Sequence, residues 1–175
     1  MPVQEATATR LPGAGDMFLS VSGAKSGQIA GEAQDHKHKN EIEVLAWSWG
    51  MQGKTSLGGG LATGKATIRE LRISKKLDKS STALMSALRT NELIKKAVLT
   101  VRKFGKNPLE YFKITIEDGR VSAFDIEAGD AAGNAALLER VSFTFNKISV
   151  EYTPQGQDGL PLGATSFEDT WSENQ

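Results

Sequence analysis

The two histidines of the chain, His36 and His38, stand two residues apart and are the first candidates for chemistry. On an extended segment they share one side, and Asp35 or Glu41 could complete a set of metal ligands. However, a lysine follows each histidine in the run DHKHKNE and would repel a cation. A Ser/His/Asp triad would have to use one of the same histidines, and no serine stands in a strand-to-helix nucleophile turn. The run therefore predicts a solvated, charged loop, with no metal site and no catalytic residue.

A glycine-rich stretch is the second candidate. Gly59 to Lys65 fits the first seven positions of the phosphate-binding pattern G-x-x-x-x-G-K, but Ala66 stands where Ser or Thr should bind magnesium. That loop binds phosphate because a helix follows it, whereas residues 66–74 here are patterned as a strand. The stretch therefore predicts a flexible loop, and no nucleotide or other cofactor is expected.

The triplet Trp47-Ser48-Trp49 is more informative. On a strand both indoles point one way, while Ala46, Ser48 and Gly50 point the other way. One interpretation is a core strand with a plain outer face. The other is a surface of small residues that lines a restricted space or meets another subunit closely.

Composition narrows the class of protein. The chain has 175 residues, 21 basic and 21 acidic side chains, 39% hydrophobic residues and no cysteine. It is long enough for one domain, and its balanced charge does not favour nucleic acid as a partner. No apolar run reaches the roughly 20 residues that span a bilayer, so stable membrane insertion is not expected. The first fifteen residues lack the apolar core of a secretory signal.

The elements that would position these residues are mostly strands. Val44 to Trp49 reads as a strand, and the stretch from Gly50 to Lys65 reads as a long extended arm. Leu84, Met85 and Leu88 have helical spacing, which predicts a helix over residues 78–91 that ends at Asn91. Further strands are predicted at residues 16–22, 67–74, 97–104, 111–117 and 121–126, the last two joined as a hairpin by Asp118-Gly119.

The last long strand, residues 141–152, changes phase. Its apolar residues are odd-numbered up to Phe145 and even-numbered from Ile148, so the apolar face flips at Asn146-Lys147. A β-bulge would restore both halves to one core, and the alternative is a strand that crosses from one sheet to another.

Together these patterns predict a mainly β protein, an antiparallel β-barrel or sandwich with one α-helix and a long extended Gly-rich loop. We expect a flexible N-terminal extension at residues 1–15, a β-barrel domain at 16–153 and an irregular C-terminal tail at 154–175.

Several segments in a fixed order carry a family resemblance. They are DMFLSVSG (16–23), DHKHKNEIEVLAWSWG (35–50), GGG (58–60), LDKSSTALMSAL (77–88), VRKFG (101–105), EYFKITIED (110–118) and ERVSFTFNKISVEYTPQ (139–155). The chain resembles the Hcp family, the tube protein of bacterial type VI secretion systems. The resemblance covers residues 16 to about 155, and the departures lie at the two ends.

The resemblance implies a non-enzymatic structural subunit. Such proteins form homohexameric rings that stack into a tube, which a contractile sheath expels with a VgrG spike at its tip and effector proteins in its lumen. The protein would then reside in the bacterial cytoplasm before firing and be secreted without a signal peptide. The alternative is a monomeric β-barrel that binds a ligand without forming rings.

Two sets of contact residues follow from the resemblance. Ala46, Ser48 and Gly50 are expected to face the lumen and the effectors. Contacts between subunits or stacked rings are expected at edge strands and loops, through Gln52, Lys54, Leu57, Gly58, Gly59, Gly60, Leu61, Gly105, Lys106 and Asn107.

Overall fold

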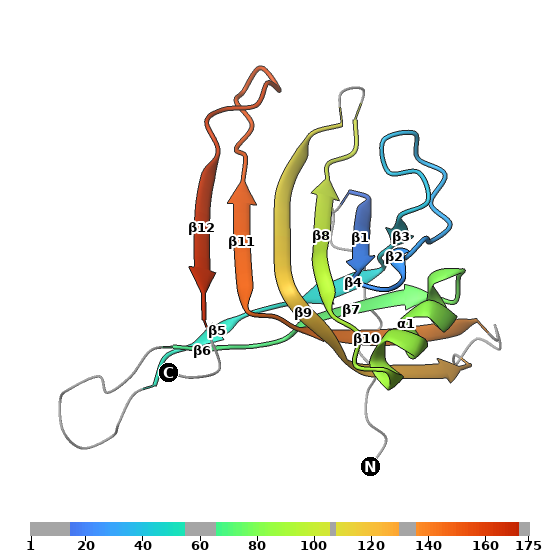
Figure 1. The fold of residues 1–175 in the computed structure, drawn as a ribbon. Helices are drawn as coiled ribbons and strands as arrows, with labels where there is room; N and C mark the ends of the chain where they lie inside the picture. The colour runs from blue at the N-terminus through green and yellow to red at the C-terminus, as the bar shows by residue number, and fades with distance from the viewer. Residues whose placement is uncertain (1–14, 55–65, 106–107, 130–135, 172–175) are drawn as a thin grey trace, which may run out of the picture.

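The computed structural model describes residues 15–54, 66–105, 108–129 and 136–171. Two layers of antiparallel strands pack face to face, and the strands of one layer cross those of the other steeply (Figure 1). In chain order the elements are β1 (Met17–Gly23), β2 (Gly27–Gln28), β3 (Ile42–Glu43), β4 (Ala46–Ser48), β5 (Met51–Gln52), β6 (Thr67–Ile68), β7 (Leu71–Lys76), α1 (Ser80–Arg89), β8 (Ile94–Arg102), β9 (Glu110–Ala128), β10 (Leu137–Thr144), β11 (Lys147–Tyr152) and β12 (Thr165–Thr170).

One long strand belongs to both layers. The first half of β9 pairs with β8 and β11, and its second half, from Arg120, pairs with β10. The first layer contains β1, β8, β11 and β12 beside the first half of β9, and the second layer has the order β9-β10-β7-β4. The mainly antiparallel β-sandwich with one helix is therefore confirmed for the described residues, whose strands do not close into a barrel.

The hairpin predicted at Asp118-Gly119 is wrong, because β9 passes through this point without reversing. A two-residue hairpin of this type needs left-handed backbone at both central residues. Asp118 has φ 52°, but Gly119 is absent from the positive-φ positions. Instead the strand bends here, and Gly119 lies so close to the next strand that an added Cβ would be 2.6 Å from the Thr144 carbonyl oxygen.

The phase change predicted at Asn146-Lys147 is a crossing between layers. β10 pairs with β7 and β9 in the second layer, and β11 pairs with β9 and β12 in the first. The two halves keep their apolar side chains in one core because the chain changes layer between them. Phe143 and Phe145 before the crossing and Ile148 after it are all buried.

The core lies between the layers and is closed on one side by α1. Fully buried side chains come from both layers, among them Leu99 and Ile114 of the first and Ile73 and Phe143 of the second. Alternate residues of each strand point inward, as the period of two requires. These side chains fix the two layers relative to each other.

The predicted helix is confirmed as α1, which packs against β9. Its buried face is built from Leu84 and Ala87, while Met85 is exposed. At its start Asp78 accepts a hydrogen bond from the Ser80 amide over 2.9 Å, and at its end Asn91 adopts φ 52°. The polar residues expected at the two ends therefore do terminate the helix.

The C-terminal segment differs from the prediction of an irregular tail. Thr165–Thr170 forms β12, which pairs with all of β11. Every residue of β12 is exposed, so its sequence has no alternation of apolar and polar residues that could reveal a strand. The strand predicted at 67–74 is also divided, into β6 and β7.

Candidate functional site

The outer face of the second layer carries the Trp-Ser-Trp triplet on β4. Trp47 points inward and stacks on Phe112, with ring centroids 5.5 Å apart, and Trp49 also packs against the core. Ala46 and Ser48 therefore point outward. Both indoles pack against the core, as either interpretation of the triplet requires. Gly50 lies beyond the end of β4, where an added Cβ would be 2.9 Å from the Arg69 guanidinium.

We define the small-residue face as the outward row Ser48, Arg72, Ser142 and Ala123, which are cross-strand partners on four neighbouring strands. The next row along the same strands is Ala46, Ser74, Arg140 and Asp125. Arg140 forms an ion pair with Glu127 at 2.5 Å, and Arg72 lies 3.9 Å from Glu70. This face suits contact with a large partner, because it offers small polar groups and paired charges.

The second layer has two open edges, which we define as β4 and the second half of β9. In the described part of the chain, β4 pairs only with β7, and β9 from Arg120 to Ala128 pairs only with β10. Their remaining backbone N–H and C=O groups can pair with a further strand. The small-residue face lies between these two edges.

A buried ion pair lies beneath this face. Lys75 of β7 and Glu139 of β10 are both fully buried, with Lys75 Nζ 2.5 Å from Glu139 Oε2. The same ammonium donates to Asp78 over 2.9 Å and to Ser81 over 3.1 Å, both at the start of α1. The pair thus fastens the helix to the second layer. Sequence reasoning missed it, although Lys75 continues the inward series of Leu71 and Ile73.

The histidine run is only partly a solvated loop. His36 is exposed, but His38 is 7% exposed and stacks on Phe18 with ring centroids 4.4 Å apart. Its Nδ1 is 2.8 Å from Glu41 and its Nε2 is 2.7 Å from Glu110. His38 therefore joins the loop before β3 to the start of β9, which is a structural role.

Arg102 makes a second junction at the same end of the molecule. Its guanidinium donates to Asp35 over 2.7 Å and to Asp16 over 3.0 Å. The hydrogen bond from Arg102 holds the pKa of Asp35 well below its usual range and raises the pKa of Arg102 itself. The guanidinium carbon also lies over the Phe18 ring, 5.2 Å from its centroid.

Glu92, just after α1, closes the turn between β1 and β2. It accepts hydrogen bonds from the Lys25 and Ser26 amides, each over 2.6 Å, and from the Ser26 hydroxyl over 2.7 Å. These bonds, the hydroxyl's above all, lower the pKa of the Glu92 carboxyl although its burial acts in the opposite direction. The carboxylate is thus held ionised in a buried position.

The residues predicted for stacking lie at two ends of the molecule. Gln52 of β5 and Lys54, two residues after it, are exposed at the β5–β6 pair, which projects from the layers at the lower end in Figure 1. Gly105, with φ 148°, lies in the β8–β9 turn at the upper end. Leu57, Gly58, Gly59, Gly60, Leu61, Lys106 and Asn107 lie outside the described residues.

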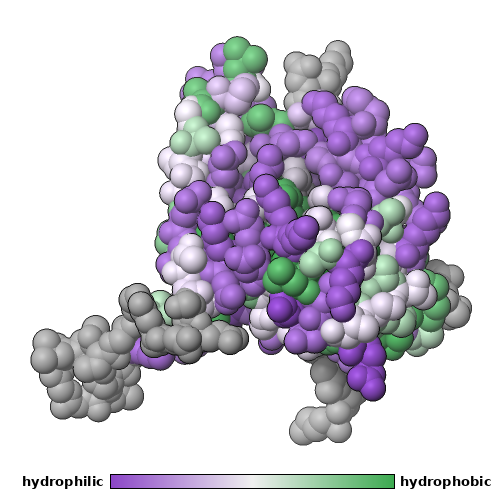
Figure 2. All heavy atoms as spheres, viewed as in Figure 1, coloured by the Kyte–Doolittle hydropathy of each residue, from purple (hydrophilic) through white to green (hydrophobic). Residues whose placement is uncertain are grey.

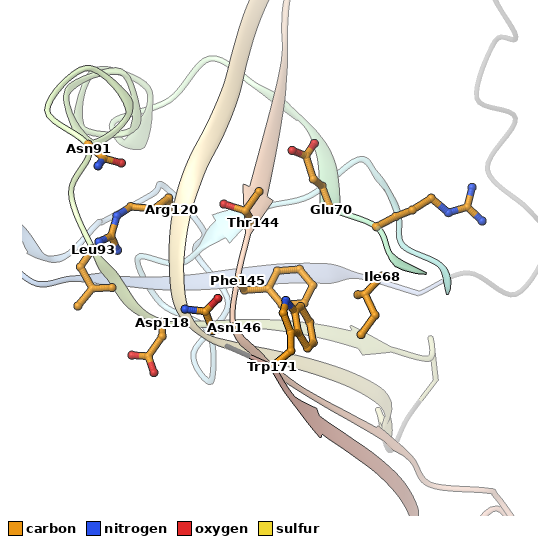
Figure 3. A pocket seen from close by; sticks show the side chains of 11 residues that line it. Ile68, Glu70, Asn91, Leu93, Asp118, Arg120, Thr144, Phe145, Asn146 and Trp171 are labelled. Atoms are coloured by element: carbon orange, nitrogen blue, oxygen red, sulfur yellow. The ribbon is translucent and has the colours of Figure 1, made fainter. Parts of the chain in front are cut away.

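A cavity of about 530 Å³ opens where the layers part at the lower end. Phe145 and Trp171 pack edge to face at its centre, with ring centroids 5.4 Å apart, and Ile68 lies beside them (Figure 3). Charged side chains of both signs surround this apolar floor, including Arg69 and Arg120. The cavity can therefore receive an apolar group with polar surroundings.

Comparison with known proteins identifies the class. Residues 18–152 match the family described as "Type VI secretion system effector, Hcp". The protein hcp1 of Pseudomonas aeruginosa is 39% identical over 151 residues, which cover 85% of this chain and 89% of that protein. The chain therefore belongs to the Hcp family of the type VI secretion system.

Solved structures agree with this assignment. The crystal structure of Hcp1 from Salmonella typhimurium has 32% identity and a TM-score of 0.71, covering 90% of this chain and 94% of its own. A type VI secretion system effector from Yersinia pestis has 28% identity and a TM-score of 0.68, covering 89% and 100%. Within the described ranges, this chain contains no helix with the length and apolar character needed to cross a membrane.

Proposed function

We propose that this chain is a structural subunit that closes into hexameric rings by joining its two open edges. The observation that supports this is the strand order β9-β10-β7-β4, with an unpaired edge at each end of one layer. Neighbouring strands in this layer are antiparallel. β4 of one copy would therefore pair antiparallel with β9 of the next copy and continue the same sheet pattern. Such a heterologous contact repeats around an axis until the ring closes.

The small-residue face would then line the hole of the ring. This face belongs to the layer whose edges join. Ser48 and Ser142 have small side chains, so Arg72 is the charged side chain that projects from it. Effector proteins carried there would meet small polar groups, which bind weakly enough to release cargo. No catalytic step is part of this role.

Rings of this kind would stack into a tube that the contractile sheath expels, tipped by the VgrG spike. The two ends of the molecule carry different surfaces, since Gly105 lies at one end and the β5–β6 pair at the other (Figure 1). Two different ends favour head-to-tail stacking. The protein would thus be secreted with the tube, from the bacterial cytoplasm.

Negative-stain microscopy of the purified chain tests the ring, and we expect hollow six-membered particles. Ser48→Trp tests the lining, because a bulky indole on the outward side of β4 would narrow the hole while leaving the backbone N–H and C=O groups of that edge able to pair. We expect rings of normal mass that no longer retain a co-expressed effector. Ser149→Trp, on the outer face of the first layer, is the matched control. Unchanged effector retention in Ser48→Trp would remove the lining assignment.

A further inference from the structure

The turn between β11 and β12 presents two leucines to solvent. Leu160 is 60% exposed and Leu162 is 55% exposed, on either side of Pro161. The view in Figure 2 shows hydrophobic side chains at this tip, above a mostly hydrophilic surface. A pair of apolar side chains at the tip of a projection is an arrangement typical of a contact with another protein.

Hydrogen bonds within the turn hold the leucines in place. The Leu162 amide donates to the Pro154 carbonyl and the Gly156 amide donates to the Leu160 carbonyl, each over 2.8 Å. The Asp158 carboxylate accepts from the Leu160 amide over 3.1 Å. The projection is therefore ordered before it meets a partner, which reduces the entropy lost on binding.

The cavity floored by Phe145 and Trp171 lies at the opposite end of the same two strands. Tyr152 and Thr165 are paired next to the turn, whereas the Trp171 amide donates to the Asn146 carbonyl at the far end. At about 3.3 Å per residue, β11 alone separates the leucines from the cavity by roughly 20 Å. The turn therefore cannot reach the cavity of its own chain.

We propose that Leu160 and Leu162 of one copy insert into this cavity of a copy in the adjacent ring. The inference rests on the proposed function, since it requires rings that stack head to tail. The geometry supports a second copy as the occupant, because the leucines and the cavity lie at opposite ends of the same two strands and head-to-tail stacking brings such ends together. Asp158 is the only charged residue of the turn, and the cavity rim balances Arg69 and Arg120 with Glu70 and Asp118.

The first test replaces the apolar contacts. We expect Leu160→Asp/Leu162→Asp to form rings of normal mass that no longer stack at concentrations where the unsubstituted chain gives tubes. The matched control is Leu77→Asp/Met85→Asp, since these side chains are 48% and 37% exposed and belong to neither the turn nor the cavity. Stacking by the turn variant at the level of the control would overturn the inference.

The second test uses the absence of cysteine from the chain. Leu162→Cys combined with Thr144→Cys, an exposed residue of the cavity lining, should give a ladder of disulfide-linked oligomers on oxidation. Each single variant should stay unlinked, because a heterologous contact does not bring identical positions together.

The two proposals fail in different ways. Rings that stack without the ladder, or rings that never stack, would overturn the leucine contact and leave ring formation standing. Particles that remain monomeric would contradict the proposed function itself. A ladder together with loss of stacking in the leucine variant supports the contact.

Discussion

Lys75 and Glu139 form a buried ion pair, and replacing Lys75 should destabilise the fold more than replacing Glu139. With Lys75→Met, Glu139 is left fully buried without the ammonium, and its Oε1 already has no hydrogen-bond partner. With Glu139→Leu, Lys75 keeps Asp78 at 2.9 Å. Removing one partner of a buried ion pair costs about 3–5 kcal/mol. We therefore expect the free energy of unfolding to fall by about 5 kcal/mol in the lysine variant and by about 3 kcal/mol in the glutamate variant.

The double variant Lys75→Met/Glu139→Leu shows whether an unpaired buried charge causes the loss of stability in the single variants. It leaves no fully buried charge without a partner, since Asp78 is partly exposed and keeps its hydrogen bond from the Ser80 amide, so we expect a free energy of unfolding within about 1 kcal/mol of the unsubstituted chain. Urea unfolding followed by tryptophan fluorescence measures all three. With a slope of about 2 kcal/mol per molar urea, the glutamate variant should shift the midpoint by about 1.5 M. A double variant as unstable as the sum of the singles would refute the reasoning. All chains must be compared at one concentration, because assembly adds to apparent stability.

Two further outcomes are expected. The pKa of Glu92 is lowered in the folded chain. The ionised carboxylate therefore contributes to the free energy of unfolding above the ordinary carboxyl pKa, and this contribution is lost as the pH falls through the lower pKa of the folded state. The destabilisation of Glu92→Gln should therefore shrink between about pH 7 and about pH 3, and a constant difference in urea midpoint would contradict this. Gly119→Ala should cost about 1–3 kcal/mol, because its Cβ would meet the backbone oxygen of Thr144. Gly50→Ala should cost less in the same thermal unfolding scan, because the Arg69 side chain can move, and equal losses would count against this.

The parts of the fold that follow from sequence are those with a clear period. The helix at Ser80–Arg89 and the inward tryptophans were predictable because apolar residues recur at the spacing each element requires. The flip after Phe145 marked the crossing between layers, although the sequence alone left a bulge as an equal alternative.

The features that sequence missed are set by tertiary contacts. Asp118-Gly119 has turn composition, yet pairing with strands on both sides of β9 keeps the chain extended through it. β12 is exposed on both faces and leaves no pattern. The acidic partners of His38 are Glu41, which is nearby in the sequence, and Glu110, which only the fold brings next to the His38 imidazole.

Sedimentation equilibrium of the purified chain over a range of concentrations tests the central claim most directly. Joining of the open edges predicts a species of six times the 18.8 kDa chain mass, and multiples of that species where rings stack. A mass of one chain at every concentration would contradict ring closure and favour a monomeric ligand-binding protein.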